Sequence, residues 1–223
     1  MDWSAFSLSI QLALGTLVVL LPLGLIMGRW MANTTFKGRV WLEAAVVLPL
    51  VLPPTVMGYY LLIGLGAASP LGAWLHNTFG LSLTFNFSGL LLASVLFNVP
   101  FMVQPIQRAF ESIPLNLSEA AQVCGLSRWQ TFTKVELPLA WPGILSAVVL
   151  TFVHTLGEFG VVLMIGGNIP GETRTLAISI YDKVQGFDLQ SAHAMSLFLL
   201  LVSMLAVALT FTLGGRTHRR RHA

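Results

Sequence analysis

Long apolar stretches alternate with short polar connections along this chain, and their lengths predict its architecture. A helix needs about 20 residues to cross a hydrocarbon core of about 30 Å. Five stretches are long enough, at about residues 8–28, 44–65, 89–107, 141–165 and 192–213. Because lipid offers the backbone no hydrogen-bond partners, each stretch is expected to be helical. The pattern predicts one all-α integral membrane domain over residues 1–223, with about five transmembrane helices.

The composition supports lipid as part of the solvent of this chain. Hydrophobic residues make up 55% of the 223 residues and charged residues only 9%, whereas a soluble domain is about 25% charged. The single cysteine, Cys124, excludes an intrachain disulfide. Four arginines between residues 216 and 221 directly follow an apolar stretch. This placement favours an anchor beside anionic membrane lipid, and no nucleic-acid partner is expected.

Lysine and arginine are distributed unevenly among the connections. The connections after the first and third stretches and the C-terminal tail together hold ten basic residues. The other two connections hold only Arg174 and Lys183. Since basic residues are retained on the cytoplasmic side, the N-terminus is predicted outside and the C-terminus in the cytoplasm.

Prolines interrupt the second and third stretches, and polar side chains lie beside them. The prolines are Pro49, Pro53 and Pro54 in the second stretch and Pro100 and Pro105 in the third. Each removes a helix hydrogen bond and bends the axis. Thr55, Asn98 and Gln104 lie in the same regions. Two interpretations stay open: these groups bond neighbouring helices, or the two stretches line a passage.

The connection of residues 108–140 contains the signals of two short helices. Asn116 with Glu119 and Ser127 with Gln130 have capping-box spacing. Gly125 lies between the pairs, where a C-terminal helix cap belongs. Pro138 is expected to end the second short helix, and Pro142 to open the next span. The connection is therefore predicted to be a helix, a glycine turn and a second helix.

The same connection resembles the EAA signature of ABC importer permeases. The residues that carry the resemblance are Glu119, Ala120, Ala121, Gly125, Val135, Leu137 and Pro138. The resemblance implies the type I ABC importer permease fold, with a coupling loop that docks on an ATP-hydrolysing subunit. An ordinary amphipathic surface hairpin is the alternative.

The chain carries no phosphate-binding G-x-x-x-x-G-K-[ST] motif of its own. It is therefore expected to be a transport subunit without enzyme activity, cofactor or metal, while a partner subunit uses ATP and Mg. Five spans form a thin wall for a pore, which favours a second copy of the chain. Two ATP-binding subunits would then dock on two coupling loops.

Three further segments, residues 48–59, 156–160 and 167–175, resemble molybdate permeases. Sulfate and thiosulfate permeases share parts of the last two segments and provide the alternative substrate. The resemblance implies import of molybdate or tungstate across a bacterial-type plasma (inner) membrane. It also implies delivery of the anion by an extracytoplasmic oxyanion-binding protein.

The polar residues near the prolines and the resemblance to molybdate permeases together give the candidate site residues. Thr55, Asn98, Gln104 and Glu158 are candidates for the translocation path, and Arg174 for an outer anion contact or a merely solvated charge. His154 and Glu158 are four residues apart, so both lie on one helix face. Two ligands make a poor metal site, so a packing or gating role is preferred. An ATP-independent carrier or channel is one rival function, but it should lack the coupling-loop pattern. An intramembrane enzyme with His154 and Glu158 as catalytic groups is another, but the sequence offers it no convincing nucleophile or complete ligand set.

Overall fold

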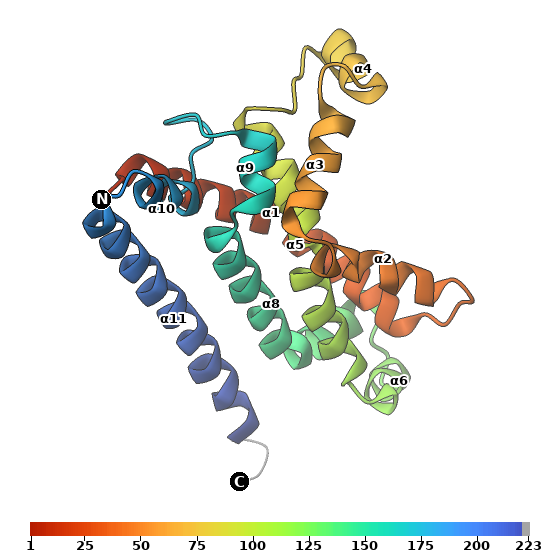
Figure 1. Ribbon diagram of the computed structural model, residues 1–223. Coiled ribbons are helices and arrows are strands. Elements are labelled where there is room, and N and C mark those ends of the chain that lie inside the picture. Colours follow the sequence, from red (N-terminus) through yellow and green to blue (C-terminus); the bar gives the residue numbers. More distant parts are fainter. Residues whose placement is uncertain (220–223) are drawn as a thin grey trace.

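The computed structural model describes residues 1–219, and side chains for residues 1–210 and 212. The tail arginines predicted to anchor the chain therefore lie outside the described residues or side chains. Within the described part, eleven α-helices and one π-helix follow one another (Figure 1). They are α1 (Trp3–Asn33), α2 (Arg39–Val51), α3 (Pro54–Leu65), α4 (Pro70–Phe79), α5 (Phe87–Glu111), α6 (Leu115–Val123), α7 (Arg128–Thr131), the π-helix η1 (Phe132–Glu136), α8 (Leu137–Gly157), α9 (Gly160–Gly166), α10 (Leu176–Gln185) and α11 (Leu189–Arg219).

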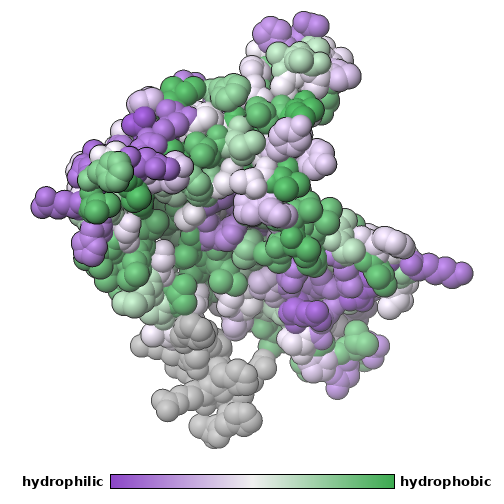
Figure 2. Space-filling model, viewed as in Figure 1, coloured by the Kyte–Doolittle hydropathy of each residue, from purple (hydrophilic) through white to green (hydrophobic). Residues whose placement is uncertain are grey.

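The prediction of about five transmembrane helices is confirmed. Four helical segments are long and apolar enough to span a membrane: Trp3–Asn33, Phe87–Glu111, Arg128–Gly157 and Leu189–Thr210. The fifth candidate is the pair α2 and α3, which are bent by 106° at their junction. Hydrophilic residues gather around α10 and near the start of α2, and hydrophobic residues cover much of the surface between them (Figure 2). The orientation of the chain in the membrane stays a prediction.

Two of the five candidate spans are interrupted within their length. Pro53 and Pro54 separate α2 from α3, as the proline pattern predicts. The interruption expected at Pro100 and Pro105 is wrong, because α5 continues through both prolines. The stretch 141–165, predicted to be continuous, instead breaks between Gly157 and Gly160. Two glycines weaken the helix there, and Glu158 is extended, with φ −67° and ψ 127°. The apolar run continues across the break, which is why hydropathy alone does not reveal it.

The coupling loop, residues 108–140, matches the predicted order of helices but not all of the predicted ends. Ser127 and Gln130 form the capping box. The cap expected at Asn116 is wrong, since α6 begins at Leu115 after Pro114 and without a side-chain cap. The stop expected at Pro138 is also wrong, because η1 runs directly into α8. A π-helical turn shifts the hydrogen-bond register just before the proline, so the chain stays helical through it.

Glycines allow α1 to approach α5 closely at the centre of the bundle. A Cβ atom at Gly24 would lie 2.5 Å from Met102 Cγ, and one at Gly28 would lie 2.8 Å from Ile106 Cγ2. This Gly-x-x-x-Gly spacing is typical of close helix pairs in membranes. Helix α5 also packs against α8. As a result, polar groups on α1, α5 and α8 lie within hydrogen-bond reach of one another.

Candidate functional site

A cavity of about 410 Å³ lies where the two interrupted spans face each other. Its lining comes from the start of α3, from α5, from the end of α8 and from the break that leads into α9: Pro54, Thr55, Phe97, His154, Gly157, Glu158, Phe159 and Gly160. A Cβ at Gly160 would lie 2.9 Å from Pro54 Cβ, so the two breaks are in direct contact. Interrupted helices at membrane depth are tolerated where they border protein or a cavity.

Glu158 is the acidic residue in the lining of this cavity, and it is only 4% exposed. Its Oε2 accepts hydrogen bonds from Ser94 Oγ at 3.3 Å and from Asn98 Nδ2 at 3.2 Å. Thr16 Oγ1 on α1 donates in turn to Ser94 Oγ at 3.0 Å. The other carboxylate oxygen, Oε1, is buried and has no partner among the described residues. The carboxylate is thus held by neutral donors on one side only.

Asn98 connects this carboxylate to His154. Its Nδ2 donates to the Ser94 carbonyl at 2.8 Å, which fixes the orientation of the amide. Asn98 Oδ1 therefore faces His154 Nδ1, at 2.9 Å. Since an amide oxygen only accepts, Nδ1 carries the proton in this arrangement. The imidazole ring also stacks on Phe101, with 3.9 Å between ring centroids.

The structure brings together most of the predicted path residues. Thr55 and Glu158 line the cavity, and Asn98 bonds Glu158 from α5. Gln104 is not among the lining residues, and its Nε2 is buried without a partner in the described chain. Sequence reasoning missed Ser94 and Thr16, since small hydroxyl residues are common in membrane helices and carry no distinct signal.

The coupling loop presents an open surface to the surroundings. Every described residue of α6 is at least partly accessible, and Glu119 and Ala120 are exposed. Gly125 has φ +88°, a backbone conformation that favours glycine. It ends the turn between α6 and α7 as the sequence predicts. Val135 and Leu137 are half-buried and Pro138 is exposed, so the motif residues lie partly on and partly under this surface.

Glu136 ties the coupling loop to the transmembrane bundle. It is 7% exposed, and its Oε2 lies 2.6 Å from Arg29 Nε at the end of α1. Its other oxygen accepts a hydrogen bond from Ser118 Oγ of α6 at 3.2 Å. The Arg29 guanidinium also lies 4.9 Å above the ring of Phe132. Sequence reasoning gave Glu136 no role of its own, because the distant partner on α1 is not visible in the motif.

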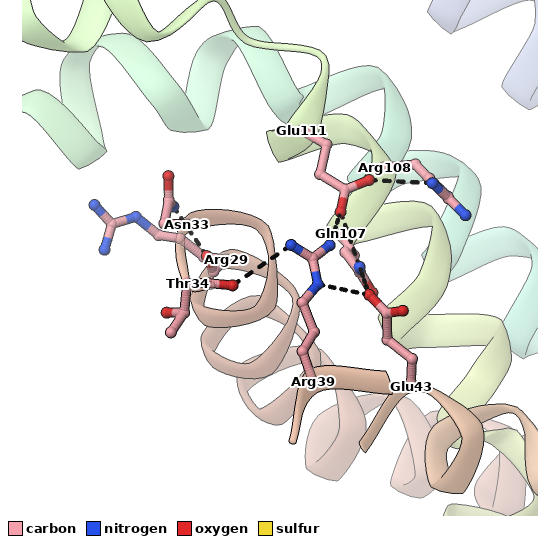
Figure 3. A network of polar contacts seen from close by, with 8 residues as sticks. All are labelled: Arg29, Asn33, Thr34, Arg39, Glu43, Gln107, Arg108 and Glu111. Carbon is pink, nitrogen blue, oxygen red and sulfur yellow. Dashed lines mark hydrogen bonds and ion pairs between the residues drawn. The ribbon is translucent and has the colours of Figure 1, made fainter. Parts of the chain in front are cut away.

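A second ionic cluster joins the start of α2 to the end of α5 (Figure 3). Arg39 is paired with Glu43 at 2.8 Å and with Glu111 at 2.6 Å. Gln107 donates to both carboxylates, at 3.1 and 2.9 Å. The cluster fixes the end of α5 just before the coupling loop begins.

Arg174, the candidate outer contact, lies at the other end of the bundle. Its Nε donates to Asn168 Oδ1 at 2.6 Å, and its guanidinium pairs with Asp182 at 3.5 Å. Asp2 lies in the same polar pocket of about 420 Å³. Partial burial acts to raise the pKa of Asp2, but bonds from the Ala5 amide and the Ser4 and Ser179 hydroxyls together hold it below its usual value. Arg174 is thus already engaged with acidic and amide groups of the chain.

In the part of the chain that the structure describes, no three His, Cys, Asp or Glu side chains are grouped as a metal site would need.

Comparisons with known proteins show the family to which the chain belongs. Residues 21–222 match the family of the binding-protein-dependent transport system inner membrane component. The molybdenum transport system permease protein ModB of Azotobacter vinelandii is 45% identical over 207 residues, covering 92% of this chain and 91% of that protein. The sulfate transport system permease protein CysT of Escherichia coli (strain K12) is 34% identical over 197 residues, covering 88% and 71%.

Solved structures show the same fold at lower identity. A bacterial ABC transporter involved in the import of the acidic polysaccharide alginate matches with a TM-score of 0.78 at 20% identity, covering 96% of this chain and 78% of that one. The MetNI methionine ABC transporter matches with a TM-score of 0.67 at 18% identity, covering 96% and 93%. The predicted type I permease fold is confirmed. The chain belongs to the family of binding-protein-dependent transport system inner membrane components, and it is a multi-pass membrane permease related to molybdate and sulfate permeases.

Proposed function

We propose that this chain imports molybdate, or tungstate, into the cytoplasm as the membrane subunit of an ATP-driven transporter. Two copies of the chain form the pathway, and two ATP-binding subunits that use ATP and Mg dock on the two coupling loops. An extracytoplasmic binding protein delivers the anion. The observation that carries the substrate is the 45% identity with a molybdenum permease along nearly the whole length of both chains. A sulfate or thiosulfate importer is the second candidate, supported by the 34% identity with a sulfate permease.

The open surface of α6 supports docking of an ATP-binding subunit. Leu115 and Val123 are 74% and 88% exposed, although both are apolar and lie outside the candidate spans. Exposed apolar residues gathered on a short helix are typical of a protein-binding surface. Glu136 connects this helix to α1, so motion of a docked subunit would reach the bundle through an ion pair.

The cavity between the two helix breaks supports a gate in the closed state. None of its described lining residues is a lysine or arginine, so an oxyanion would meet the Glu158 carboxyl group there without a compensating positive charge from them. We therefore assign Thr55, Asn98 and Glu158 to a barrier that separates to let the anion pass. Gln104 is assigned to the path beyond the cavity, and Arg174 to the outer mouth once its pairing with Asp182 opens.

Uptake of labelled molybdate by the transporter reconstituted in vesicles tests the substrate. Uptake should require ATP inside the vesicles and should persist in excess sulfate. Equal competition by sulfate would assign the chain to the second candidate. Uptake without ATP would contradict an ATP-driven importer altogether.

The glycine turn tests the docking role separately from the substrate. Gly125→Val forces a β-branched residue into φ +88° and should abolish ATP-dependent uptake, because α6 and α7 lose their angle. Gly125→Asn is the matched control, since asparagine tolerates this conformation, and it should retain uptake. If Gly125→Val transported at the normal rate, the turn would have no part in coupling.

A further inference from the structure

A further cavity lies at the coupling-loop end and is separate from the candidate gate. Its volume is about 610 Å³, and it opens between the C-terminal half of α1 and the segment formed by α7 and η1. Among its lining residues are two arginines, two tryptophans and one phenylalanine, and none is acidic. Neither the coupling motif nor the proposed path accounts for this composition.

The α1 wall of the cavity changes from apolar to polar along the helix. Leu25 and Ile26 come first, Arg29 and Trp30 follow one turn later, and Asn33 and Thr34 one turn after that. At 1.5 Å per residue, this gradient extends over about 12 Å. It follows the order of groups in a phospholipid, from acyl chain to phosphate to hydrated headgroup.

The two arginines leave a net positive charge at the middle level of this gradient. Arg29 uses its Nε for Glu136, and its two terminal amino groups have no partner among the described residues, so they can donate to a ligand. Its guanidinium is directed away from the Arg39 cluster in Figure 3. Arg128 has no ion pair or hydrogen-bond partner among the described residues, and its side chain is exposed. With Glu136 balancing Arg29, the site has one excess positive charge, which matches a singly charged phosphodiester.

Two tryptophans mark this level as the membrane–water interface. Trp30 and Trp129 are 47% and 71% exposed, although both are large and apolar. Tryptophan is enriched at the level of lipid headgroups, where one side of the indole is apolar and the other is hydrated. Ile26, one turn deeper, is 69% exposed and would contact acyl chains.

We propose that this cavity binds the headgroup of an anionic phospholipid, such as phosphatidylglycerol. Its phosphate lies between Arg29 and Arg128, and an acyl chain follows Leu25 and Ile26. A basic pocket between membrane helices is a known type of site for such lipids. Because Arg29 holds Glu136 and Glu136 holds Ser118, the bound lipid also stabilises the position of the coupling loop.

A docked ATP-binding subunit is the competing occupant of the cavity. Leu25 and Ile26 lie inside a helix that is apolar enough to span the membrane, so a soluble subunit would have to reach below the headgroup level to fill the cavity. The lipid meets both the apolar floor and the charged rim, which is why it is preferred.

Native mass spectrometry of the full-length chain, purified from membranes with its accompanying subunits, tests the proposal. Phosphatidylglycerol and phosphatidylcholine are added in parallel to the wild type, Arg128→Gln, Arg128→Lys and Lys37→Gln. The wild type should prefer phosphatidylglycerol, and Arg128→Gln should weaken that binding about tenfold. Arg128→Lys should fall between them, because lysine keeps the charge without the planar pair of donors. Lys37→Gln is the matched control, an exposed cation between α1 and α2 that should bind like the wild type.

Three outcomes would overturn the proposal. Equal retention of the two lipids would remove the charge argument. Displacement of the lipid by millimolar inorganic phosphate would indicate a site for a free anion. Unchanged lipid binding in Arg128→Gln, together with loss of the ATP-binding subunits, would assign the cavity to protein docking.

Discussion

Two buried glutamates lie at the two ends of α8, and their surroundings differ. Glu136 directly precedes the helix and Glu158 directly follows it, and they are 7% and 4% exposed. Glu136 is paired with the Arg29 guanidinium at 2.6 Å and bonded by Ser118. Within the described part of the chain, Glu158 has only neutral donors, Ser94 and Asn98, at 3.3 and 3.2 Å, and one of its oxygens is unpaired.

The difference indicates different mechanical roles for the two ends of the same helix. A buried charge with a short ion pair resists displacement, because separating the pair leaves both charges poorly solvated. A carboxylate with long, neutral hydrogen bonds and an unpaired oxygen has less to lose when its neighbours move. We infer that the loop end of α8 moves as one body with α1 and α6, whereas the Glu158 end is where the spans separate.

Among the variants that test this comparison, Glu136→Gln is expected to have the largest effect on stability and on uptake. Removing one partner of a buried ion pair costs about 3–5 kcal/mol, and the partial exposure of Arg29 reduces this to about 2 kcal/mol. The coupling loop also loses its tie to α1, so molybdate uptake per ATP hydrolysed should fall about tenfold. Unfolding in mixed micelles and coupled uptake and ATPase assays measure the two effects.

A double-mutant cycle with Arg29→Gln separates the ion pair from other losses. The double variant should be little worse than Glu136→Gln alone, because both changes remove the same pair. If the two effects simply added, Glu136 and Arg29 would act independently. The inference that the coupling loop and the bundle move as one body would then be wrong.

Ser127→Ala sharpens the comparison by testing whether local helix signals order the loop without Glu136. Ser127 Oγ accepts from the Gln130 amide, and Gln130 Oε1 accepts from the Ser127 amide. Loss of such a cap costs about 1 kcal/mol. The uptake rate should fall by less than in Glu136→Gln, and Ser127→Asp, which keeps a capping oxygen, should behave like the wild type. A larger loss in Ser127→Ala than in Glu136→Gln would show that the cap, and not the ion pair, holds the loop.

Local features of the molecule can be predicted from the sequence, whereas contacts between distant residues cannot. Span lengths, the proline break at Pro53 and Pro54 and the glycine turn at Gly125 are local properties, so hydropathy and backbone preferences reveal them. The Ser127 cap is local as well and follows from its spacing to Gln130. Pro138 misleads because its effect depends on the π-helical turn that precedes it.

Pairs of residues that are far apart in the sequence could not be predicted, for a physical reason. Glu136 and Arg29 are 107 residues apart in the sequence, and Glu158 and Ser94 are 64 apart. The sequence around each residue does not indicate which helices become neighbours. That depends on close packing between helices, such as the contact of Gly24 with Met102. The break at Glu158 depends on such a contact too, since α5 supplies the donors that hold the carboxylate outside a regular helix.

Glu158→Gln is expected to have the smallest effect on stability, and it tests the comparison most directly. Glutamine keeps the oxygen that accepts from Ser94 and Asn98, and no described residue supplies a counter-ion for the carboxyl group that it replaces. The lower cost of burying a neutral amide offsets its unpaired NH₂ group, so the free energy of unfolding should stay within about 0.5 kcal/mol of the wild type. Uptake should nevertheless change severalfold, because the group lies at the proposed gate. Thr151→Val is the matched control: it removes a buried hydroxyl of α8 that has no partner in the described chain and does not line the cavity, and it should leave uptake unchanged. If Glu158→Gln destabilised the protein as much as Glu136→Gln, the two ends of α8 would be held alike and the gate would have to lie elsewhere.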